Sequence, residues 1–364
     1  MRILFHLGHP AHFHLFKNVI QSLKDKGHTI AILIKKKDIL EDLLKASGLE
    51  YINILPKGRK DSKFGIALGV IESDYKILRF SISFKPNLLI GTSYAISHVG
   101  KLLRIPSINL NEDDSDIVPL YSKLSYPWAS VILSPNVCNN GKWNKKTIKY
   151  NGYHELTSLH PNHFSPSIDI VKKYIPIDKP FFLFRFAKLN AHHDKGIRGI
   201  NDDLAFKIIE VLKPYGNIYI TSERKFDEKF EPFRLHIDPF EIHHVMAFAT
   251  IYIGDSQTMA AEAGVLGTPF IRFNDFVGRI GYLNDLENNY SLGYGIKPNE
   301  TEKLFQKIEE LVSTENLMEI FSIRRKKMLS EKIDVTAFIV WFIENYPKSV
   351  SIMKAEPDYQ YHFK

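Results

Sequence analysis

Residues 254–273, GDSQTMAAEAGVLGTPFIRF, hold the side chains whose types and spacing say most about chemistry. The pattern predicts a buried strand over residues 249–254, a short helix of small residues opened by Ser256, a Gly-Thr-Pro stop and a second buried strand. Glu262 lies inside that apolar helix. A buried carboxylate is costly unless it is hydrogen-bonded. We therefore expect Glu262 to bind the two adjacent hydroxyls of a nucleotide ribose.

The start of the predicted helix is the second part of this candidate site. The first N–H groups of a helix have no partner within the helix, and they favour anions. We expect Ser256, Gln257 and Thr258 to bind the diphosphate of the same ligand. The alternative is structural, with Ser256 as a helix cap and small residues that pack closely on a sheet. That alternative leaves Glu262 unexplained, so we favour nucleotide-sugar binding.

A second group of candidates follows the predicted opening strand, in the turn GHPAHFH at residues 8–14. Imidazole is a frequent metal ligand, but no acidic or cysteine partner completes a recognisable metal spacing here. His12, at the helix start, is our candidate for a general base or a hydrogen-bonding residue, because histidine titrates near neutral pH. His9 is the second choice for this role. We assign His9 and His14 to the side of the site that would bind the acceptor of a transferred sugar. The alternative is a surface or capping histidine.

Acidic residues follow the strand predicted over residues 107–111, in the run Glu112-Asp113-Asp114-Ser115-Asp116. A strand-end position would place Glu112 and Asp113 in the active site. Burial or like-charge crowding would raise the pKa of one of them, so that it could accept a proton from an acceptor hydroxyl. The alternative is an acidic helix N-terminus. We weigh the two equally for Glu112 and prefer the cap for Asp116.

Basic side chains near predicted strand ends in the second half of the chain are further candidates for binding the nucleotide-sugar donor. Arg185 lies in the strand predicted over residues 181–186, and an arginine at the end of a strand can bind phosphate oxygens with two N–H groups. Lys188, Ser222 and Arg224 are weaker candidates. With the helix N-terminus they would neutralise a leaving diphosphate, so we expect no cofactor and no metal. The alternative for Arg185 is an ion pair across the domain seam.

Strands and helices alternate along the first 135 residues. Short apolar runs of the kind buried on both faces of a parallel sheet predict six strands, over residues 2–7, 29–34, 51–55, 87–91, 107–111 and 130–134. Helical patterns lie between them, and glycines end those over residues 13–26 and 39–47. The alternation restarts at residue 181 and includes a strand expected over residues 234–237. Repeated βα units predict α/β doubly wound sheets.

The rhythm breaks between residues 136 and 180, where Asn, Gly, Pro and His crowd the stretch NGYHELTSLHPNHFSP, which we interpret as the interdomain linker. We divide the chain into an acceptor-side domain (1–160), a nucleotide-sugar-binding domain (161–335) and a C-terminal helix and tail that pack back on the body (336–364). The residues after Pro347 look loose. Two doubly wound halves of this kind describe the GT-B architecture, in which the natural active site is the cleft between the halves.

Composition narrows the class of protein. The chain has 364 residues, of which 44% are hydrophobic, and one cysteine, Cys138. It is therefore a folded protein without a disulfide framework, which fits the cytoplasm. No secretory signal or bilayer-spanning apolar run is visible. A net charge of +7 fits either solvated lysine-rich loops or docking to an anionic membrane surface at the inner face of the cell membrane. We expect no nucleic acid partner, because no recognition motif accompanies the basic residues.

Five blocks of the sequence resemble a prokaryotic GT-B-like family of unknown function, related in fold to non-hydrolysing UDP-sugar 2-epimerases and nucleotide-sugar glycosyltransferases. They are GHPAHFHLFK, PSINLNED, NGYHELTSLHP, FLFRFA and GDSQTMAAEAGVLGTP. The resemblance implies that the serine of the last block binds diphosphate and that Glu262 binds ribose. Gln257 and Thr258 stand where those enzymes often have Gly-Gly, which leaves less room for a diphosphate.

These observations lead us to expect a metal-independent glycosyltransferase. It would move a sugar from a nucleoside-diphosphate donor, taken to be UDP, to a polysaccharide, glycolipid or lipid-linked acceptor in surface polysaccharide or glycolipid synthesis. The first alternative is a non-hydrolysing UDP-sugar 2-epimerase, which would need acid/base carboxylates such as those near Glu112. The second is a non-catalytic nucleotide-binding subunit.

Overall fold

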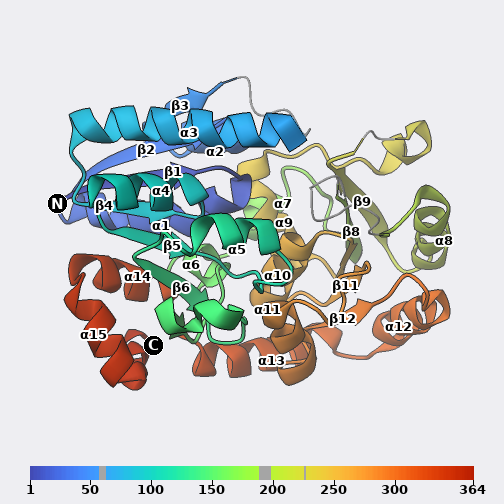
Figure 1. The fold of residues 1–364 in the computed structure, drawn as a ribbon. Helices are drawn as coiled ribbons and strands as arrows, with labels where there is room; N and C mark the ends of the chain where they lie inside the picture. The colour runs from blue at the N-terminus through green and yellow to red at the C-terminus, as the bar shows by residue number, and fades with distance from the viewer. Residues whose placement is uncertain (57–62, 188–197, 225–226) are drawn as a thin grey trace. The chain divides into compact units, whose positions relative to one another are not determined.

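The computed structural model describes residues 1–56, 63–187, 198–224 and 227–364, and Figure 1 shows their secondary structure. The chain forms two compact units. The first unit comprises Met1–Ser158 and Lys332–Lys364, and the second comprises Leu159–Glu331. The C-terminal segment, which follows the second unit in sequence, therefore belongs to the first.

The described part of the first unit contains a seven-stranded parallel sheet in the order β3-β2-β1-β4-β5-β6-β7. Its central strands are buried along their whole length, because helices cover both faces of the sheet. Helices α3, α4 and α5 form one layer, and α1 packs with α2 and α14 in another. The strands are β1 (Arg2–Leu7), β2 (Thr29–Lys35), β3 (Ile52–Leu55), β4 (Leu88–Gly91), β5 (Ser107–Leu110), β6 (Val131–Pro135) and β7 (Thr147–Tyr150). The helices are α1 (Pro10–Asp25), α2 (Leu40–Ala46), α3 (Lys63–Phe84), α4 (Tyr94–Leu103), α5 (Pro119–Ser125), η1 (Gly141–Lys146), α6 (Leu156–Leu159, at the division), α14 (Val335–Glu344), α15 (Lys348–Ala355) and η5 (Pro357–Phe363).

The described part of the second unit contains a five-stranded parallel sheet in the order β12-β11-β10-β8-β9. Both sheets are doubly wound, so the α/β class predicted from the sequence is confirmed. The strands are β8 (Phe181–Phe186), β9 (Asn217–Ser222), β10 (Ile251–Gly254), β11 (Phe270–Phe273) and β12 (Gly293–Ile296). The helices are α7 (Ile168–Val171), α8 (Asp202–Leu212), η2 (Glu228–Phe233), η3 (Pro239–Glu241), α9 (Ile242–Phe248), α10 (Gln257–Leu266), α11 (Gly281–Asn284), η4 (Asp285–Asn289), α12 (Thr301–Ser313) and α13 (Leu317–Glu331).

Each sheet has one point at which its strand order reverses. In the first unit this switch point lies between β1 and β4, and in the second between β8 and β10. A glycine allows the strands to approach closely at both places. A Cβ on Gly91 would lie 2.6 Å from the carbonyl oxygen of His6, and one on Gly254 would lie 2.8 Å from that of Arg185. Ligands of doubly wound sheets bind beyond the carboxyl ends of the strands at such points.

Three expectations about secondary structure are wrong. The expected linker contains β7, an edge strand of the first sheet that pairs with β6. Residues 234–237 form no strand, because only Arg234 makes a bridge, to Ile220. The residues after Pro347 form α15 and η5, and the ring of Trp341 in α14 stacks on Tyr359 at 4.8 Å between centroids. Aromatic packing therefore orders the tail.

Candidate functional site

Helix α10 begins where the sequence predicted, at the switch point of the second sheet. Ser256 is its N-cap, and the hydroxyl of Ser256 accepts a hydrogen bond from the Met259 N–H at 3.4 Å. Gly267 ends the helix in the left-handed conformation at φ 86°. Gln257 and Thr258 are half-buried in its first turn. The helix therefore presents its N-terminus at the carboxyl end of β10, the position that suits an anionic ligand.

Glu262 is buried, with 6% of its surface exposed, but it has a partner within the protein. Its carboxylate lies 3.2 Å from Nε2 of His243, a buried side chain of helix α9. The assignment of Glu262 to a ribose stays a prediction, and His243 is a second group close to the same carboxylate. A ribose at Glu262 would share the carboxylate with His243, since a carboxylate has about four acceptor positions.

A buried arginine that the sequence analysis did not consider holds the first residue of α10. Arg272, in β11, has no exposed surface. Its Nη1 donates to Oε1 of Gln257 at 2.8 Å, and its Nε donates to Glu287 at 2.9 Å. Burial raises the pKa of Glu287, and the charge of Arg272 opposes that rise. The side chain of Gln257 is thus fixed in place, and a buried Arg272–Glu287 ion pair lies beneath the helix N-terminus.

Asp255, which follows β10 directly, holds two chain segments in place. It is 1% exposed and accepts hydrogen bonds from the N–H groups of Ala187 at 2.6 Å and Ile200 at 3.3 Å. Burial raises its pKa to about 6, although these hydrogen bonds and the charge of Arg224 lower it. Asp255 therefore connects the carboxyl end of β10 to the residues after β8 and before α8.

The other donor-side candidates are dispersed over two strand ends. Arg185, at the end of β8, pairs with Glu223 at 2.5 Å, so its ion pair lies within the second unit and the seam interpretation is wrong. Arg224 donates to the carbonyl of Ile200 at 2.5 Å. The Ser222 hydroxyl accepts from the Arg224 N–H at 3.2 Å and donates to the Arg224 carbonyl at 3.0 Å. Lys188 lies outside the described residues.

In the first unit, His12 lies at the switch point between β1 and β4. It is the third residue of α1, and its Nδ1 accepts a hydrogen bond from the Gly8 N–H at 3.0 Å. The hydroxyl of Thr92, just after β4, lies 2.8 Å from Nδ1 and 2.7 Å from Nε2. His9 is the N-cap of α1 and accepts from the Ala11 N–H at 3.2 Å, as the capping interpretation predicts.

Electrostatics keep His12 neutral. Burial is the largest cause that holds its pKa well below 6.5, and Coulombic interactions with His9, Lys35, His6 and His154 add to it. Because Nδ1 accepts the Gly8 hydrogen, the proton of the neutral ring resides on Nε2. His12 is therefore an uncharged residue that donates from Nε2, and it can accept a proton at Nδ1 only if the Gly8 bond breaks.

Glu112 is engaged by a loop of the same unit. One carboxylate oxygen accepts from the main-chain N–H of His154 at 3.1 Å, and the other lies 3.5 Å from Nδ1 of His154. Burial lowers the pKa of His154 to about 4, although Glu155 and Asp113 oppose this. The helix-cap interpretation of the acidic run is wrong, because α5 begins at Pro119 without a side-chain cap.

Asp113 and His14 have less defined places. Asp113 is half-buried, and its carbonyl accepts from Nδ2 of Asn111 at 2.9 Å. His14 lies one turn into α1, where its carbonyl accepts from the Thr157 hydroxyl at 3.3 Å and its ring contacts Phe13. His12 and Glu112 remain the better-placed candidates of the first unit.

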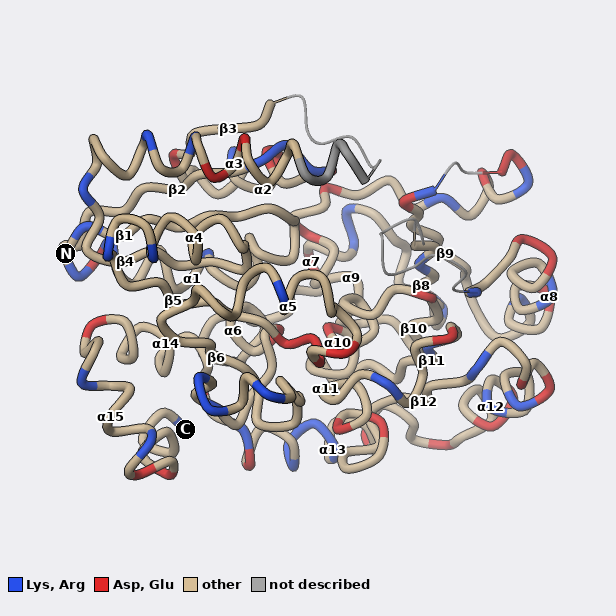
Figure 2. Tube along the Cα trace, in the orientation of Figure 1, with Lys and Arg blue, Asp and Glu red and all other residues tan. Residues whose placement is uncertain are grey.

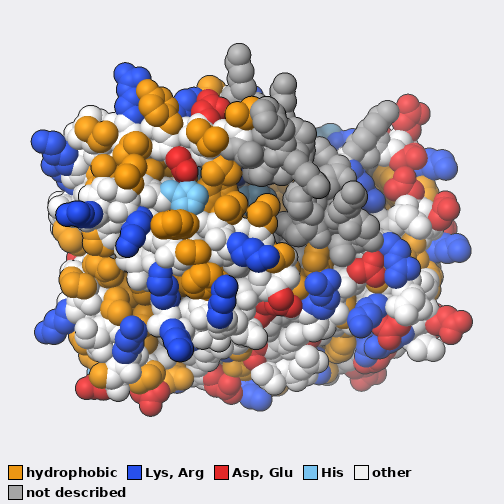
Figure 3. Space-filling model, in the orientation of Figure 1, with side chains coloured by type: hydrophobic (Ala, Val, Ile, Leu, Met, Phe, Trp, Pro, Cys, Tyr) orange, Lys and Arg blue, Asp and Glu red, His pale blue; other side chains and the backbone are white. Residues whose placement is uncertain are grey.

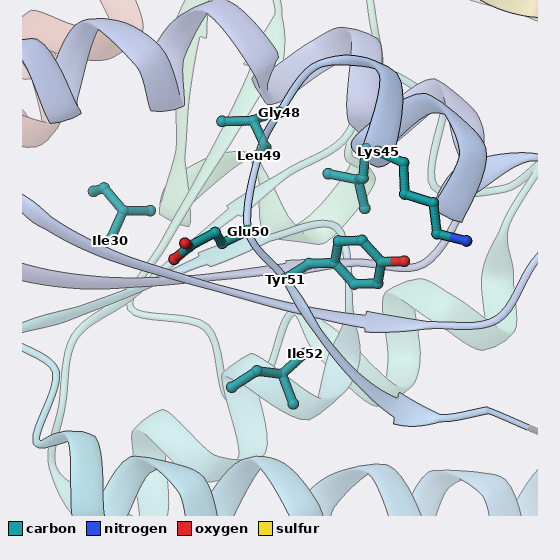
Figure 4. A pocket seen from close by; sticks show the side chains of 8 residues that line it. Ile30, Lys45, Gly48, Leu49, Glu50, Tyr51 and Ile52 are labelled. Atoms are coloured by element: carbon teal, nitrogen blue, oxygen red, sulfur yellow. The ribbon is translucent and has the colours of Figure 1, made fainter.

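Two surface hollows were not expected from the sequence. One of about 570 Å³ lies at the amino ends of β2 and β3, lined by side chains such as Tyr51 and Lys45 (Figure 4). It lies at the sheet edge opposite His12 and contains no predicted site residue. Another of about 720 Å³ lies in the second unit, and Arg198, Lys207 and Arg224 line it with the start of α8.

The described residues offer neither a metal-binding cluster nor a membrane-spanning helix. No group of three His, Cys, Asp or Glu side chains in this part of the chain is arranged to hold a metal ion. No helix within the described ranges is both long and apolar enough to cross a membrane.

Residues whose roles depend on tertiary contacts were not predicted from the sequence. Thr92, His154 and Asp255 become visible only when strand ends meet at a sheet edge. Arg272 did have a signal in the sequence, since an arginine inside the apolar run FIRF must be paired if the strand is buried.

Solved structures that resemble this chain include a UDP-GlcNAc 2-epimerase, a complex with UDP and a rhamnosyltransferase. UDP-GlcNAc 2-epimerase from Neisseria meningitidis bound to UDP-GlcNAc has 14% identity and a TM-score of 0.65, covering 95% of this chain and all of that one. The S. aureus MnaA–UDP structure has 13% identity and a TM-score of 0.68, covering 96% and 98%. Spinosyn rhamnosyltransferase SpnG, complexed with spinosyn aglycone, has 13% identity and a TM-score of 0.61, covering 93% and 99%.

At these identities the likeness shows the fold, which is that of GT-B glycosyltransferases and UDP-GlcNAc 2-epimerases. No curated protein matches the chain. Residues 1–291 match the family described as "Protein of unknown function (DUF354)". That match covers well over half of the sequence and confirms the resemblance to a family of unknown function. The chain belongs to the DUF354 family.

Proposed function

We propose that the protein is a glycosyltransferase that uses a nucleoside-diphosphate sugar, with UDP as the nucleotide. One observation carries this proposal, namely the N-terminus of α10 at the switch point of the second sheet. There the cap residue Ser256 and the side chain of Gln257, which Arg272 holds in place, flank one helix end. The first N–H groups of a helix suit a diphosphate.

The first unit would provide the acceptor side. His12 is neutral at physiological pH and lies at the carboxyl end of β1, next to Thr92. In this proposal the acceptor hydroxyl displaces the Gly8 N–H from Nδ1 of His12, and Nδ1 accepts the hydroxyl proton as the glycosidic bond forms. The donor's anomeric carbon–oxygen bond breaks, and the nucleoside diphosphate leaves with the electron pair.

The leaving diphosphate would be stabilised by fixed charges of the second unit. Thr258 lies in the first turn of α10, and Arg185 lies at the neighbouring strand end, where Glu223 orients its guanidinium. Such preorganised donors stabilise charge that develops in a transition state. We therefore propose that transfer requires no divalent cation, and full activity in excess EDTA is the expected result.

Titration of UDP against purified protein tests the donor site. Glu262→Ala is expected to weaken UDP at least tenfold, about 1.4 kcal/mol. The matched control is Glu241→Ala, in the same unit, because Glu241 bonds Tyr174 and Lys173 and occupies no part of the proposed site. Equal UDP affinity for wild type and a folded Glu262→Ala variant would refute the ribose assignment.

A 2-epimerase is the second candidate, and Glu112 is the observation that favours it. Its carboxylate lies beside His154 and near Asp113, a set of acid/base groups that proton transfer at a sugar carbon would need. The distinguishing measurement is exchange of the C2 proton of UDP-GlcNAc in deuterated water without acceptor. Exchange supports the epimerase. UDP binding with neither exchange, transfer nor donor hydrolysis would indicate a non-catalytic subunit.

We further propose that the acceptor belongs to surface polysaccharide or glycolipid synthesis, and that the protein works in the cytoplasm at the inner face of the membrane. The net charge of +7 supports contact with anionic lipids. Transfer of labelled sugar to a lipid-extractable product, by wild type and not by His12→Ala, is the expected outcome.

A further inference from the structure

Helix α3 presents apolar side chains on its outward face as well as to the core. Leu68, Ile71, Tyr75 and Ile82 have 52%, 65%, 59% and 59% of their surface exposed. Their spacing of three, four and seven residues places them on one side of the helix. The opposite side packs inward through residues such as Ile77, which is fully buried. A surface helix normally carries polar residues on its outward face.

The neighbouring helices extend this apolar surface. Leu102 in α4 is 68% exposed, Leu120 in α5 is 45% exposed and Trp128 just after α5 is 47% exposed. Helix α4 packs between α3 and α5, so these side chains belong to one layer of the first unit. Large apolar side chains more than half exposed are rare elsewhere in the described residues. Five of the six lie on this layer: Leu68, Ile71, Tyr75, Ile82 and Leu102, with Ile323 in the second unit as the sixth.

The charged residues of the same layer are mainly basic. From residue 68 onward its helices and the residues that end them contain six cations and two carboxylates. Both carboxylates are paired, Glu72 with Lys76 and Asp74 with His98. Among the described residues no carboxylate lies within ion-pair distance of the other five cations, which are Arg79, Lys85, Lys101, Arg104 and Lys123.

The figures show the same distribution. Figure 3 shows apolar and basic side chains interspersed over α3, α4 and α5, with few acidic ones. By contrast, Figure 2 shows both signs of charge along α8 and α12 of the second unit. Exposed apolar side chains interspersed with cations match a lipid surface in two ways, since the apolar groups insert and the cations meet anionic head groups.

We propose that the α3–α4–α5 face, defined by the seven apolar side chains and five cations above, docks on an anionic lipid bilayer. A second copy of the chain fits this face less well, because an isologous contact would bring the cations of two equal faces together. Trp128 lies where an interfacial tryptophan is favourable, with an apolar ring and a polar N–H. The inference rests on the membrane contact in the proposed function and names its surface.

The test measures vesicle binding without nucleotide or acceptor, so its outcome is separate from that of the donor site. Wild type is expected to co-sediment with phosphatidylcholine vesicles that contain phosphatidylglycerol, and at least tenfold more weakly with phosphatidylcholine alone. Added salt should weaken binding. Trp128 emission should shift to the blue on binding, and the shift should be absent in Trp128→Phe.

Two double variants probe the face, and one variant is the control. Ile71→Asp with Ile82→Asp removes apolar contacts, and Lys101→Glu with Lys123→Glu reverses charge; each should reduce binding at least tenfold. Ile323→Asp, at a 60% exposed position of α13, should bind like wild type. Two results would overturn the proposal: no preference for anionic vesicles, or a wild-type dimer in solution that the Ile71 and Ile82 substitutions convert to a monomer.

Discussion

His6 gives the sharpest test of the electrostatics inferred for the first unit. It lies in β1, is 3% exposed, and neither ring nitrogen has a hydrogen-bond partner among the described residues. Burial, assisted by the charge of Lys35, lowers its pKa from 6.5 to about 3. His6 is therefore neutral in the folded protein and charged in the unfolded chain at mildly acidic pH.

The sign and size of the effect follow from these pKa values. Between about pH 6.5 and 3 the unfolded state binds the proton more tightly, so stability is fully present above this window and is lost as pH falls. Each such histidine contributes a loss of about 2 kcal/mol between pH 7 and pH 5. His154, with a pKa near 4, adds a similar amount. Together the two lower stability by about 4 kcal/mol.

The perturbation is His6→Leu, which removes one of these groups. The variant should lose about 2 kcal/mol less than wild type over the same pH interval. Urea unfolding followed by tryptophan fluorescence is the assay. All three tryptophans, Trp128, Trp143 and Trp341, lie in the first unit, so the signal reports on that unit alone.

The comparison of pH slopes isolates His6, because every other titrating group is shared by the two proteins. His362→Leu, at an exposed histidine of the same unit, is the matched control for the substitution of a histidine by leucine. If His6→Leu loses as much stability as wild type between pH 7 and pH 5, the buried neutral histidine is not the cause and the reasoning fails.

Two further predictions concern the proposed site. Arg272→Met should weaken UDP binding about tenfold, because it releases Gln257. The substitution also leaves Glu287 unpaired, so the double variant Arg272→Met/Glu287→Gln should recover stability without recovering UDP affinity. Recovered affinity would mean that Arg272 only stabilises the fold. Because the pKa of His12 is lowered, kcat should fall with decreasing pH only below pH 6.5. A fall in kcat that begins above pH 7 and is absent in His12→Asn would contradict this.

Much of the fold could be predicted from the sequence because it depends on local patterns. Buried parallel strands appear in the sequence as short apolar runs, and the observed bounds of β1, Arg2–Leu7, are those predicted from the sequence. Helix α10 was predictable for a similar reason, since its cap Ser256 and its ending glycine are adjacent to it in sequence. The edge strand β7 was missed because it is four residues long, follows two lysines and includes Lys149.

Side-chain partners were not predictable, because they join residues far apart in the chain. Glu262 and His243 are 19 positions apart and come from different helices. The tail shows the same limit, since the side chain of Gln360 accepts from the N–H of Asn151 across 209 positions. A sequence pattern shows that a buried polar group needs a partner, whereas only the fold shows which residue provides it.

The contact between Glu262 and His243 changes what supports ligand binding at α10. Burial of the carboxylate is the weaker argument, because Nε2 of His243 already lies 3.2 Å from Glu262. Position is the stronger argument. The end of α10 lies at the switch point of its sheet, where Gly254 allows close approach of β8. Arg272 forms a buried ion pair with Glu287 at 2.8 Å, so it adds no net charge beneath the helix, and its contribution is to hold the side chain of Gln257 in the first turn. A fixed polar side chain beside the N–H groups of a helix N-terminus suits an anion, which is why UDP affinity, and not stability alone, is the decisive readout for Arg272 and Glu262.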